Sequence, residues 1–132
     1  MTTPLKKPFE ILSVDDDPDM LTIFSYLMKM RGYHVTASHN AKDFWDILND
    51  KKPDLIFLDI YMQGINGIDL CRSLKSDAAT RDIPIVLLSA TENVKEIAAS
   101  CHADGYLTKP FIIKDVVAEI QRLLMINPVP SN

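Results

Sequence analysis

The residues best suited to chemistry each follow a short apolar run of the chain. They are Asp15 and Asp16, Asp59, Ser89 and Lys109. A carboxylate placed after a run as apolar as residues 55–58 has no packing role, and burying it without a partner would be strongly unfavourable. These side chains therefore indicate a site where strand ends meet partners or solvent.

The acidic residues and the lysine of this set have complementary charges. Three clustered carboxylates repel one another by roughly 4 kcal/mol per pair at a separation of 4 Å and an effective dielectric constant of 20. Such a cluster needs cations: Lys109 supplies one, and a hard divalent ion is the natural second. Mg²⁺ suits a few carboxylates and waters and shares its other positions with phosphoryl oxygens. Any one of these residues alone would more simply be a polar strand end, but the whole set, with its complementary acid, hydroxyl and ammonium groups, predicts a functional site.

Five apolar segments have the length and the flanking residues of strands. They are residues 9–14, 33–38, 55–59, 85–89 and 105–109. The third follows Pro53-Asp54 and the fourth follows Pro84, and both are continuously apolar until their last residue. Continuous apolar runs of this length are typical of strands that are buried on both faces of a sheet.

Helical periodicity fills the connections between these strands. The expected helices run from Pro18 to Arg31, from Asn40 to before Pro53, from Gly67 to about Ser76, around residues 94–98, and from Ile112 to Met125. Asp17 is placed to cap the first helix, and Asn40 and Asn66 are placed to cap the second and third. Pro18 suits the first helical position, and Gly32 ends the first helix. The chain therefore alternates strand and helix throughout.

Strands joined by helical crossovers must run parallel, with right-handed connections. The first, third and fourth strands are the most apolar, which places them in the centre of the sheet. The sequence thus predicts an α/β protein with a flavodoxin-like (βα)5 fold, a doubly wound parallel sheet of strand order 2-1-3-4-5. The expected domain spans residues 9–127, between tails at residues 1–8 and 128–132.

Composition and charge exclude several classes of function. A chain of 132 residues with 47% hydrophobic residues suits one domain, and a net charge of −4 without a basic stripe argues against nucleic-acid binding. No apolar run is long enough for a membrane span or a signal peptide. The two cysteines, Cys71 and Cys101, lack metal-site or CxxC spacing, which predicts reduced thiols and a cytoplasmic protein. The three scattered histidines also lack ligand spacing.

The ordered motifs resemble the receiver domain of two-component response regulators, including chemotaxis response regulators. The motifs are Val14-Asp15-Asp16, Leu58-Asp59, Leu88-Ser89-Ala90 and Gly105-Tyr106-Leu107-Thr108-Lys109-Pro110-Phe111. The resemblance implies that Asp59 is the phosphoacceptor, modified by a sensor histidine kinase or a histidine phosphotransfer protein. It also implies that Asp15, Asp16, Asp59 and the backbone carbonyl of Tyr61 hold Mg²⁺.

The resemblance further implies how the signal leaves the site. Lys109, before a cis Pro110, contacts the phosphoryl group, and Ser89 donates its hydroxyl once Asp59 is modified. Tyr106 is the second switch residue, and the face made by the fourth helix, the fifth strand and the fifth helix binds a downstream protein or a second copy in a homodimer. The output is a shift of population in a signalling module, and the only chemistry is its own phosphorylation and dephosphorylation.

The loop after Asp59 departs from the commonest family pattern. Gln63 stands where proline is usual, and Asn66 stands where aspartate is common. The resemblance implies that Tyr61 and Thr91, each two residues past a site residue, border the path of the hydrolytic water; the alternative is that Tyr61 points to solvent. The large ring of Tyr61 therefore predicts slow self-dephosphorylation.

Three other functions remain as alternatives. A receiver used only as a binding scaffold would not need the complete residue set. A phosphatase with an aspartyl nucleophile, similar to haloacid dehalogenases, would need a second acid at the position of Tyr61. A flavin-binding module would place phosphate against Asp15-Asp16-Asp17, which would repel it. The sequence leaves open whether this is a stand-alone receiver or a piece of a longer regulator or hybrid kinase, and which kinase acts on it.

Overall fold

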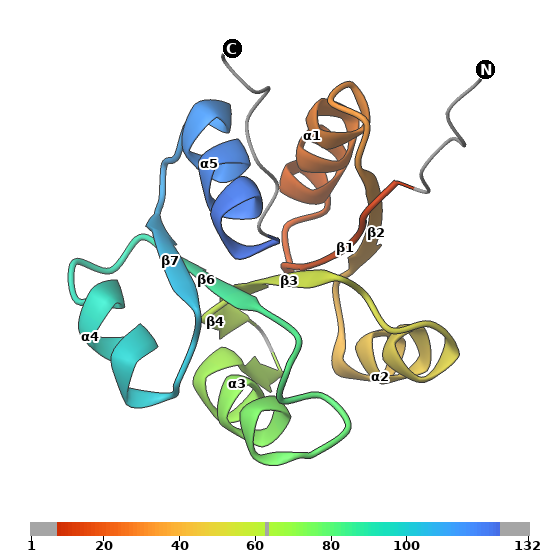
Figure 1. Ribbon diagram of the computed structural model, residues 1–132. Helices are drawn as coiled ribbons and strands as arrows, with labels where there is room; N and C mark the ends of the chain where they lie inside the picture. Colours follow the sequence, from red (N-terminus) through yellow and green to blue (C-terminus); the bar gives the residue numbers. More distant parts are fainter. Residues whose placement is uncertain (1–7, 63, 125–132) are drawn as a thin grey trace, which may run out of the picture.

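The computed structural model describes residues 8–62 and 64–124 of the chain. The expected tails, except for Pro8, and the departure at Gln63 lie outside the described residues. One sheet contains five parallel strands in the order β2-β1-β3-β6-β7 (Figure 1). Their bounds are β1 (Glu10–Val14), β2 (His34–Ser38), β3 (Leu55–Asp59), β6 (Ile85–Ser89) and β7 (Gly105–Thr108). In chain order this is the predicted 2-1-3-4-5 arrangement, because β4 and β5 lie outside this sheet.

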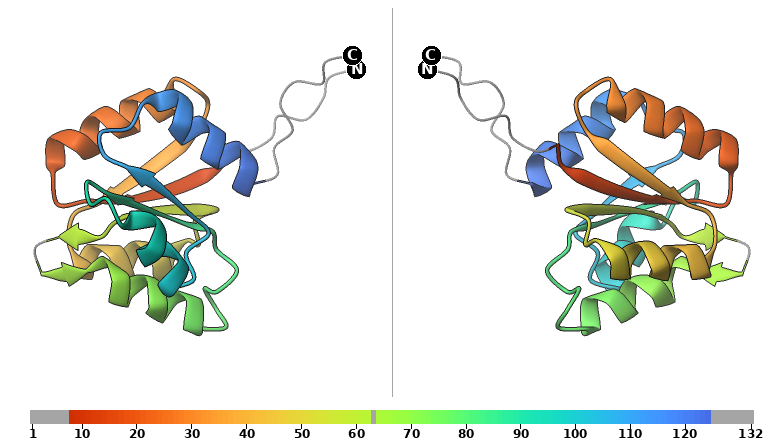
Figure 2. Two further views of the ribbon diagram at one scale, coloured as in Figure 1. Left: turned by 90° about the vertical axis from the view of Figure 1, so that its left-hand side faces the viewer. Right: turned by 90° about the vertical axis from the view of Figure 1, so that its right-hand side faces the viewer.

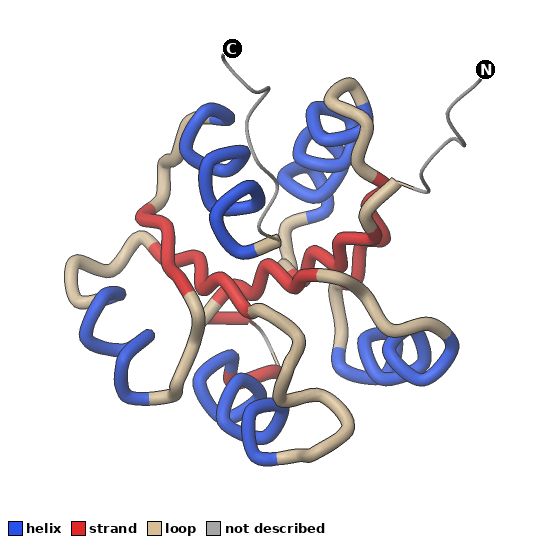
Figure 3. The backbone as a smooth tube through the Cα atoms, in the orientation of Figure 1, coloured by secondary structure: helices blue, strands red, loops and turns tan. Residues whose placement is uncertain are grey.

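Five helices cover the two faces of the sheet. They are α1 (Pro18–Lys29), α2 (Ala41–Asp50), α3 (Gly67–Ser76), α4 (Val94–Ser100) and α5 (Ile113–Leu123). Helices α1 and α5 lie on one face, and α2, α3 and α4 lie on the other (Figures 1 and 2). The strands therefore form a central layer between two helical layers (Figure 3). This is the doubly wound α/β fold that the sequence predicts.

Each helical layer closes its own apolar core against the sheet. Phe24 of α1 packs with Phe57 of β3, with ring centroids 5.1 Å apart in an edge-to-face arrangement. On the opposite face, Phe44 of α2 and Leu74 of α3 are buried with Leu58. Alternate residues of β3 thus serve opposite cores, which is why residues 55–58 are continuously apolar.

The helix starts follow the capping residues that the sequence indicates. Asp17 accepts from the N–H groups of Asp19 and Met20 at 3.0 and 3.3 Å. Asn40 accepts from the Asp43 N–H at 2.8 Å. Asn66 accepts from the N–H groups of Ile68 and Asp69 at 3.0 and 3.2 Å. Each cap satisfies donors that the first helical turn leaves unpaired, so the three predicted caps are confirmed.

The largest difference from the sequence-based expectation lies directly after Asp59. The segment expected to be a loop contains two short antiparallel strands, β4 (Tyr61–Met62) and β5 (Ile65–Asn66). Gly64 turns the chain between them with a φ of 78°. Strands of two residues are too short for an alternating pattern to predict. Elsewhere the elements differ by one or two residues at their ends; α1 ends at Lys29, before the expected Arg31.

The two cysteines are free and buried in the core on the α2–α3–α4 side of the sheet. Burial, reinforced by the neighbouring Cys101, raises the pKa of the Cys71 thiol far above its ordinary value. Because thiolates are the reactive form, we expect neither thiol to react with an aromatic disulfide reagent in the native protein, and both to react in denaturant. The absorbance of the aromatic thiolate that the reagent releases measures how fast the cysteines react. Rapid native reaction at either cysteine would contradict the buried placement.

Two of the three histidines have structural explanations. His34 pairs with Glu10 across β1 and β2, and Lys51 approaches the other oxygen of Glu10 at 2.8 Å. These pairs lower the pKa of Glu10, through the hydrogen bond to Lys51 first. His102 adopts a φ of 63° in the turn after α4.

Among the described residues, no helix has both the length and the apolar character that a membrane crossing requires.

Candidate functional site

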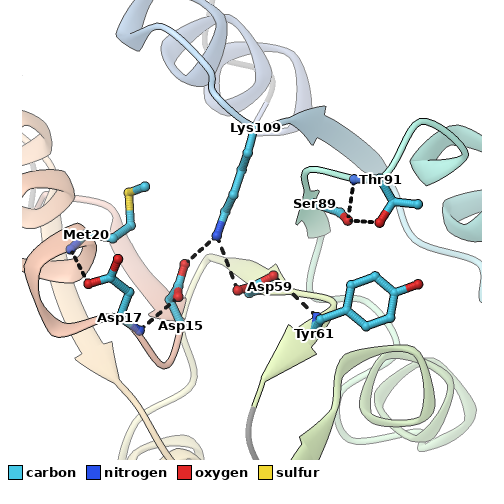
Figure 4. A network of polar contacts seen from close by, with 8 residues as sticks. All are labelled: Asp15, Asp17, Met20, Asp59, Tyr61, Ser89, Thr91 and Lys109. Atoms are coloured by element: carbon cyan, nitrogen blue, oxygen red, sulfur yellow. Dashed lines mark hydrogen bonds and ion pairs between the residues drawn. The ribbon is translucent and has the colours of Figure 1, made fainter.

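The polar residues singled out in the sequence meet at the carboxyl edge of the parallel sheet. Asp15 follows β1, Asp59 and Ser89 end β3 and β6, and Lys109 follows β7. The strand register aligns them, since Val14 pairs with Leu58 and Ser89 pairs with Thr108. Figure 4 shows Asp15, Asp59 and Lys109 joined by polar contacts, with Ser89 at the end of the neighbouring strand. Parallel strands deliver their ends to one edge, and ligands of open α/β sheets bind there.

Lys109 joins the two buried carboxylates at this edge of the sheet. Its Nζ donates to Asp15 Oδ2 at 2.9 Å and to Asp59 Oδ2 at 3.2 Å (Figure 4). Asp15 is 2% exposed and Asp59 is 7% exposed, so both carboxylates are shielded from bulk water. The lysine therefore supplies the positive charge that a buried acidic pair requires.

Burial and the neighbouring charges shift the pKa values of Asp59 and Lys109. Burial is the main cause that raises the pKa of the Asp59 carboxyl above its ordinary value; Lys109 opposes this and Asp15 reinforces it. Burial alone would lower the pKa of Lys109, but the hydrogen bond to Asp15 and both carboxylates raise it above its ordinary value. A second cation near Asp15 and Asp59 would relieve the remaining repulsion.

The donor atoms at this edge fit a hard divalent cation. One carboxylate oxygen from each of Asp15, Asp16 and Asp59 can be chosen so that all three lie within 4.8 Å of one another. Among the described residues, no other group of three or more histidine, cysteine, aspartate or glutamate side chains is placed to hold a metal ion. Asp16 is exposed, so one side of the acidic cluster faces solvent. An all-oxygen set with an open side suits Mg²⁺, which keeps several waters.

Backbone hydrogen bonds hold the acidic residues in position. The Asp15 N–H donates to the Ser38 carbonyl at 3.1 Å, and the Asp17 N–H donates to Asp15 Oδ1 at 3.0 Å. The Tyr61 N–H donates to Asp59 Oδ1 at 3.4 Å. Ser38 and Asp17 were not expected to support the site, and no sequence signal identifies the Ser38 carbonyl, since every residue carries one.

Gly67 packs directly against the backbone that carries Asp59. Its N–H donates to the Ile60 carbonyl at 2.9 Å. A Cβ atom added to Gly67 would lie 2.7 Å from Ile60 Cα and would also meet the Asp59 carbonyl. The start of α3 can approach β3 this closely only because residue 67 has no side chain.

Ser89 and Lys109 are joined through the backbone, whereas the Ser89 side chain has other partners. The Lys109 N–H donates to the Ser89 carbonyl at 2.8 Å, and the Lys109–Pro110 peptide is cis, as expected. The Ser89 hydroxyl donates to Thr91 Oγ1 at 2.8 Å. The structure thus brings Ser89 to the site edge with its hydroxyl engaged by Thr91.

The two tyrosines singled out in the sequence lie outside the acidic cluster. Tyr61 is 62% exposed, and its ring extends away from the Asp59 carboxylate (Figure 4). Tyr106 is 38% exposed and lines a groove of about 630 Å³ between α4, β7 and α5. Tyr106 therefore lies on the α4–β7–α5 face, outside the acidic cluster.

Comparison with known families decides what this arrangement belongs to. Residues 11–121 match the family model of the response regulator receiver domain. The chain belongs to this family. The receiver domain is the signalling module of two-component response regulators, and phosphorylation and Mg²⁺ binding at an acidic pocket are typical of it. The family resemblance inferred from the motifs is confirmed.

Individual relatives show the receiver domain in different settings. The chain is 38% identical over 116 residues to the phosphate regulon transcriptional regulatory protein PhoB of Pseudomonas aeruginosa, covering 86% of this chain and 51% of PhoB. It is similar to the receiver domain of a signal transduction histidine kinase from Syntrophus aciditrophicus, with a TM-score of 0.81, 29% identity and coverage of 94% and 96%. The chemotaxis protein CheY4 of Vibrio cholerae shares the fold, with a TM-score of 0.80, 21% identity and coverage of 88% and 98%.

The receiver domain spans about half the length of the curated relatives that it matches. In those relatives the matched segment is one part of a longer regulator. The solved structures that match over nearly their whole length include a histidine kinase receiver domain and a chemotaxis protein.

Proposed function

We propose that this receiver domain accepts a phosphoryl group on Asp59 from a phosphohistidine of a sensor histidine kinase or a histidine phosphotransfer protein. The observation that carries the proposal is the bridge of Lys109 Nζ between Asp15 and Asp59 at the carboxyl edge of the sheet. A lysine held there can donate a hydrogen bond to a phosphoryl oxygen once Asp59 carries the phosphoryl group. Phosphoryl transfer needs mainly in-line positioning and neutralised charge.

The proposed step forms one bond and breaks another. A carboxylate oxygen of Asp59 attacks the phosphorus atom, a P–O bond forms, and the P–N bond to the donor imidazole breaks. Lys109 stays close to both carboxylates and to the transferred oxygens. The Tyr61 N–H, at 3.4 Å from Asp59 Oδ1, helps to orient the carboxylate.

The proposed cofactor is Mg²⁺, held by Asp15, Asp16, Asp59 and the backbone carbonyl of Tyr61. When bound, it would supply positive charge to the phosphoryl oxygens. The clustering of three carboxylate oxygens within 4.8 Å supports this assignment.

The proposed output is a change of the α4–β7–α5 face. A phosphoryl group adds charge and acceptor oxygens to Asp59, and the Ser89 hydroxyl would turn to one of them. Tyr106 would then move inward, which would reshape the groove that it lines. A downstream protein or a second copy in a homodimer would bind there. With a net charge of −4, this segment itself would not bind nucleic acid, and its compartment would be the cytoplasm.

Intact mass after incubation with acetyl phosphate and Mg²⁺ tests the acceptor assignment. We expect wild type to gain one phosphoryl group and Asp59→Asn to gain none, because the amide is a poor nucleophile of nearly the same shape. An adduct that persists in Asp59→Asn would refute the assignment. The absence of an adduct in either protein would favour a scaffold that does not use phosphorylation.

Tyr61 is expected to tune the lifetime of the phosphoaspartate. Its ring is exposed and points away from the Asp59 carboxylate, so it would screen the phosphoaspartate only in part (Figure 4). We expect Tyr61→Ala to shorten the lifetime by about 3-fold, since partial exclusion of water slows hydrolysis. Tyr61→Phe keeps the ring and should match wild type. Loss of the adduct followed by mass measures the lifetimes, and equal values for wild type and Tyr61→Ala would sink the idea.

A further inference from the structure

The hydroxyl of Ser89 is held by the residue that lies two positions further along the chain. It donates to Thr91 Oγ1 at 2.8 Å and accepts from the Thr91 N–H at 3.0 Å. Within the described part of the chain these are the hydrogen bonds of this hydroxyl. Figure 4 shows both of them running to Thr91 and not to Asp59. Ser89 is 1% exposed, so water does not readily replace either partner.

A serine hydroxyl carries one proton and can therefore donate only one full hydrogen bond. The proton given to Thr91 Oγ1 is the proton that a phosphoryl oxygen on Asp59 would need. We propose that the Thr91 hydroxyl acts as a latch, which holds the Ser89 hydroxyl away from the acceptor and weakens the binding of a phosphoryl group at Asp59. This inference rests on the proposed function of Asp59 and assigns a positioning role to Thr91.

Thr91 also forms the turn that begins α4. Its carbonyl accepts from the Val94 N–H at 3.3 Å. Asn93, at the N-cap position of α4, makes no side-chain capping bond, so side-chain capping does not hold the start of this short helix. Val94 is buried, and α4 packs on β7, the strand that carries Tyr106. Release of Ser89 from Thr91 would thus loosen the first turn of α4 and reach the α4–β7–α5 face.

Replacing Thr91 by valine tests the latch with little change of shape. Valine keeps the branched side chain and the backbone N–H but removes the acceptor Oγ1. In the unmodified protein the buried Ser89 proton then lacks its partner, whereas a phosphoryl oxygen can accept it in the bound state. The net worth of one hydrogen bond predicts that Thr91→Val binds a phosphoryl mimic about 3- to 10-fold more tightly than wild type. Thr91→Ser keeps a hydroxyl and should bind as wild type does.

The probe is beryllofluoride with Mg²⁺, titrated into the full chain and followed by amide NMR signals. Beryllofluoride is a stable phosphoryl mimic, so its affinity is independent of the hydrolysis rate that Tyr61 and Thr91 are expected to affect. The gain in Thr91→Val should vanish in a Ser89→Ala background, because the latch has nothing to hold there. Thr91→Ala, which also lacks the hydroxyl, should bind more tightly than wild type and serves if Thr91→Val does not fold.

A second readout needs no ligand. Hydrogen exchange of the Thr91 amide should be faster in Ser89→Ala than in wild type, because the N–H then loses its acceptor Oγ. Equal affinity of Thr91→Val and Thr91→Ser, or a gain that survives in Ser89→Ala, would overturn the latch while leaving Asp59 as the acceptor. Failure of wild type to bind beryllofluoride would instead overturn the acceptor assignment, and the latch with it.

Discussion

Lys109→Met is expected to lower the free energy of unfolding at pH 7 by about 2–4 kcal/mol, since removing one partner leaves buried charges unpaired. Lys109 Nζ lies 2.9 Å from Asp15 and 3.2 Å from Asp59, and both carboxylates are buried. Chemical denaturation in buffer without divalent ions measures the loss. The same variant should form the acetyl phosphate adduct about 100-fold more slowly, because it lacks a donor for the transferring oxygens.

The destabilisation by Lys109→Met should depend on pH. Attraction to Lys109 is the largest cause that lowers the pKa of Asp59, so its loss raises this pKa further. A carboxyl whose pKa is raised by folding binds more protons in the folded state than in the unfolded state. Stability therefore falls as the pH rises from the unfolded-state pKa of Asp59 to its higher folded-state pKa. The loss of stability caused by Lys109→Met should accordingly shrink in acid.

Two matched variants isolate the cause of this effect. Asp15→Asn combined with Lys109→Met removes one of the repelling charges and should recover most of the lost stability. Lys42→Met removes a lysine whose 3.2 Å pair with Asp46 is highly exposed, and should change stability by about 0.5 kcal/mol or less. If Lys109→Met were as stable as wild type, the lysine would not compensate the acidic pair.

Gly67→Ala is expected to destabilise the protein by about 1–3 kcal/mol, as an overpacked site does. Helix propensity alone predicts the opposite sign, because alanine is better than glycine by about 1 kcal/mol inside a helix. The added Cβ would lie 2.7 Å from Ile60 Cα and 2.9 Å from the Ile60 carbonyl oxygen, and backbone cannot move aside as a flexible side chain does. Steric overlap therefore outweighs propensity.

The same substitution should displace Asp59 and slow adduct formation by about 10- to 100-fold, since small misplacements of a reacting group are costly. Gly32→Ala is the control. Gly32 has a φ of 88° and open space around its Cα, so alanine there costs about 1–2 kcal/mol of backbone strain far from the site. Comparable loss of stability with normal adduct formation in Gly32→Ala would separate site distortion from instability. Normal adduct formation in Gly67→Ala would contradict the close-packing argument.

The sheet and the capping residues could be predicted from the sequence because their signals are local. Residues 55–58 and 85–88 are continuously apolar, and both strands are fully buried in the centre of the sheet. The caps at Asp17, Asn40 and Asn66 could be predicted because each capping bond spans only two or three residues. The β4–β5 hairpin could not be predicted in the same way, since two-residue strands carry no periodicity.

The support of the site was less accessible to prediction from sequence. The Ser38 carbonyl holds Asp15 through a bond between adjacent strand ends, and Gly67 abuts Asp59 because α3 begins against β3. Neither residue type marks such a role. The bond between Ser89 and Thr91 is local, but the choice of Thr91 as the hydroxyl's partner depends on side-chain rotation, which residue spacing does not fix.

The sequence by itself determined which residues reach one edge of the sheet, because alternating strands and helices force parallel strands to end together. Only the tertiary structure decided which of them pair. Lys109 reaches Asp15 across 94 residues and Asp59 across 50 residues of chain. Pairing over such separations depends on strand register, packing and side-chain direction, which are properties of the folded chain and not of any local pattern.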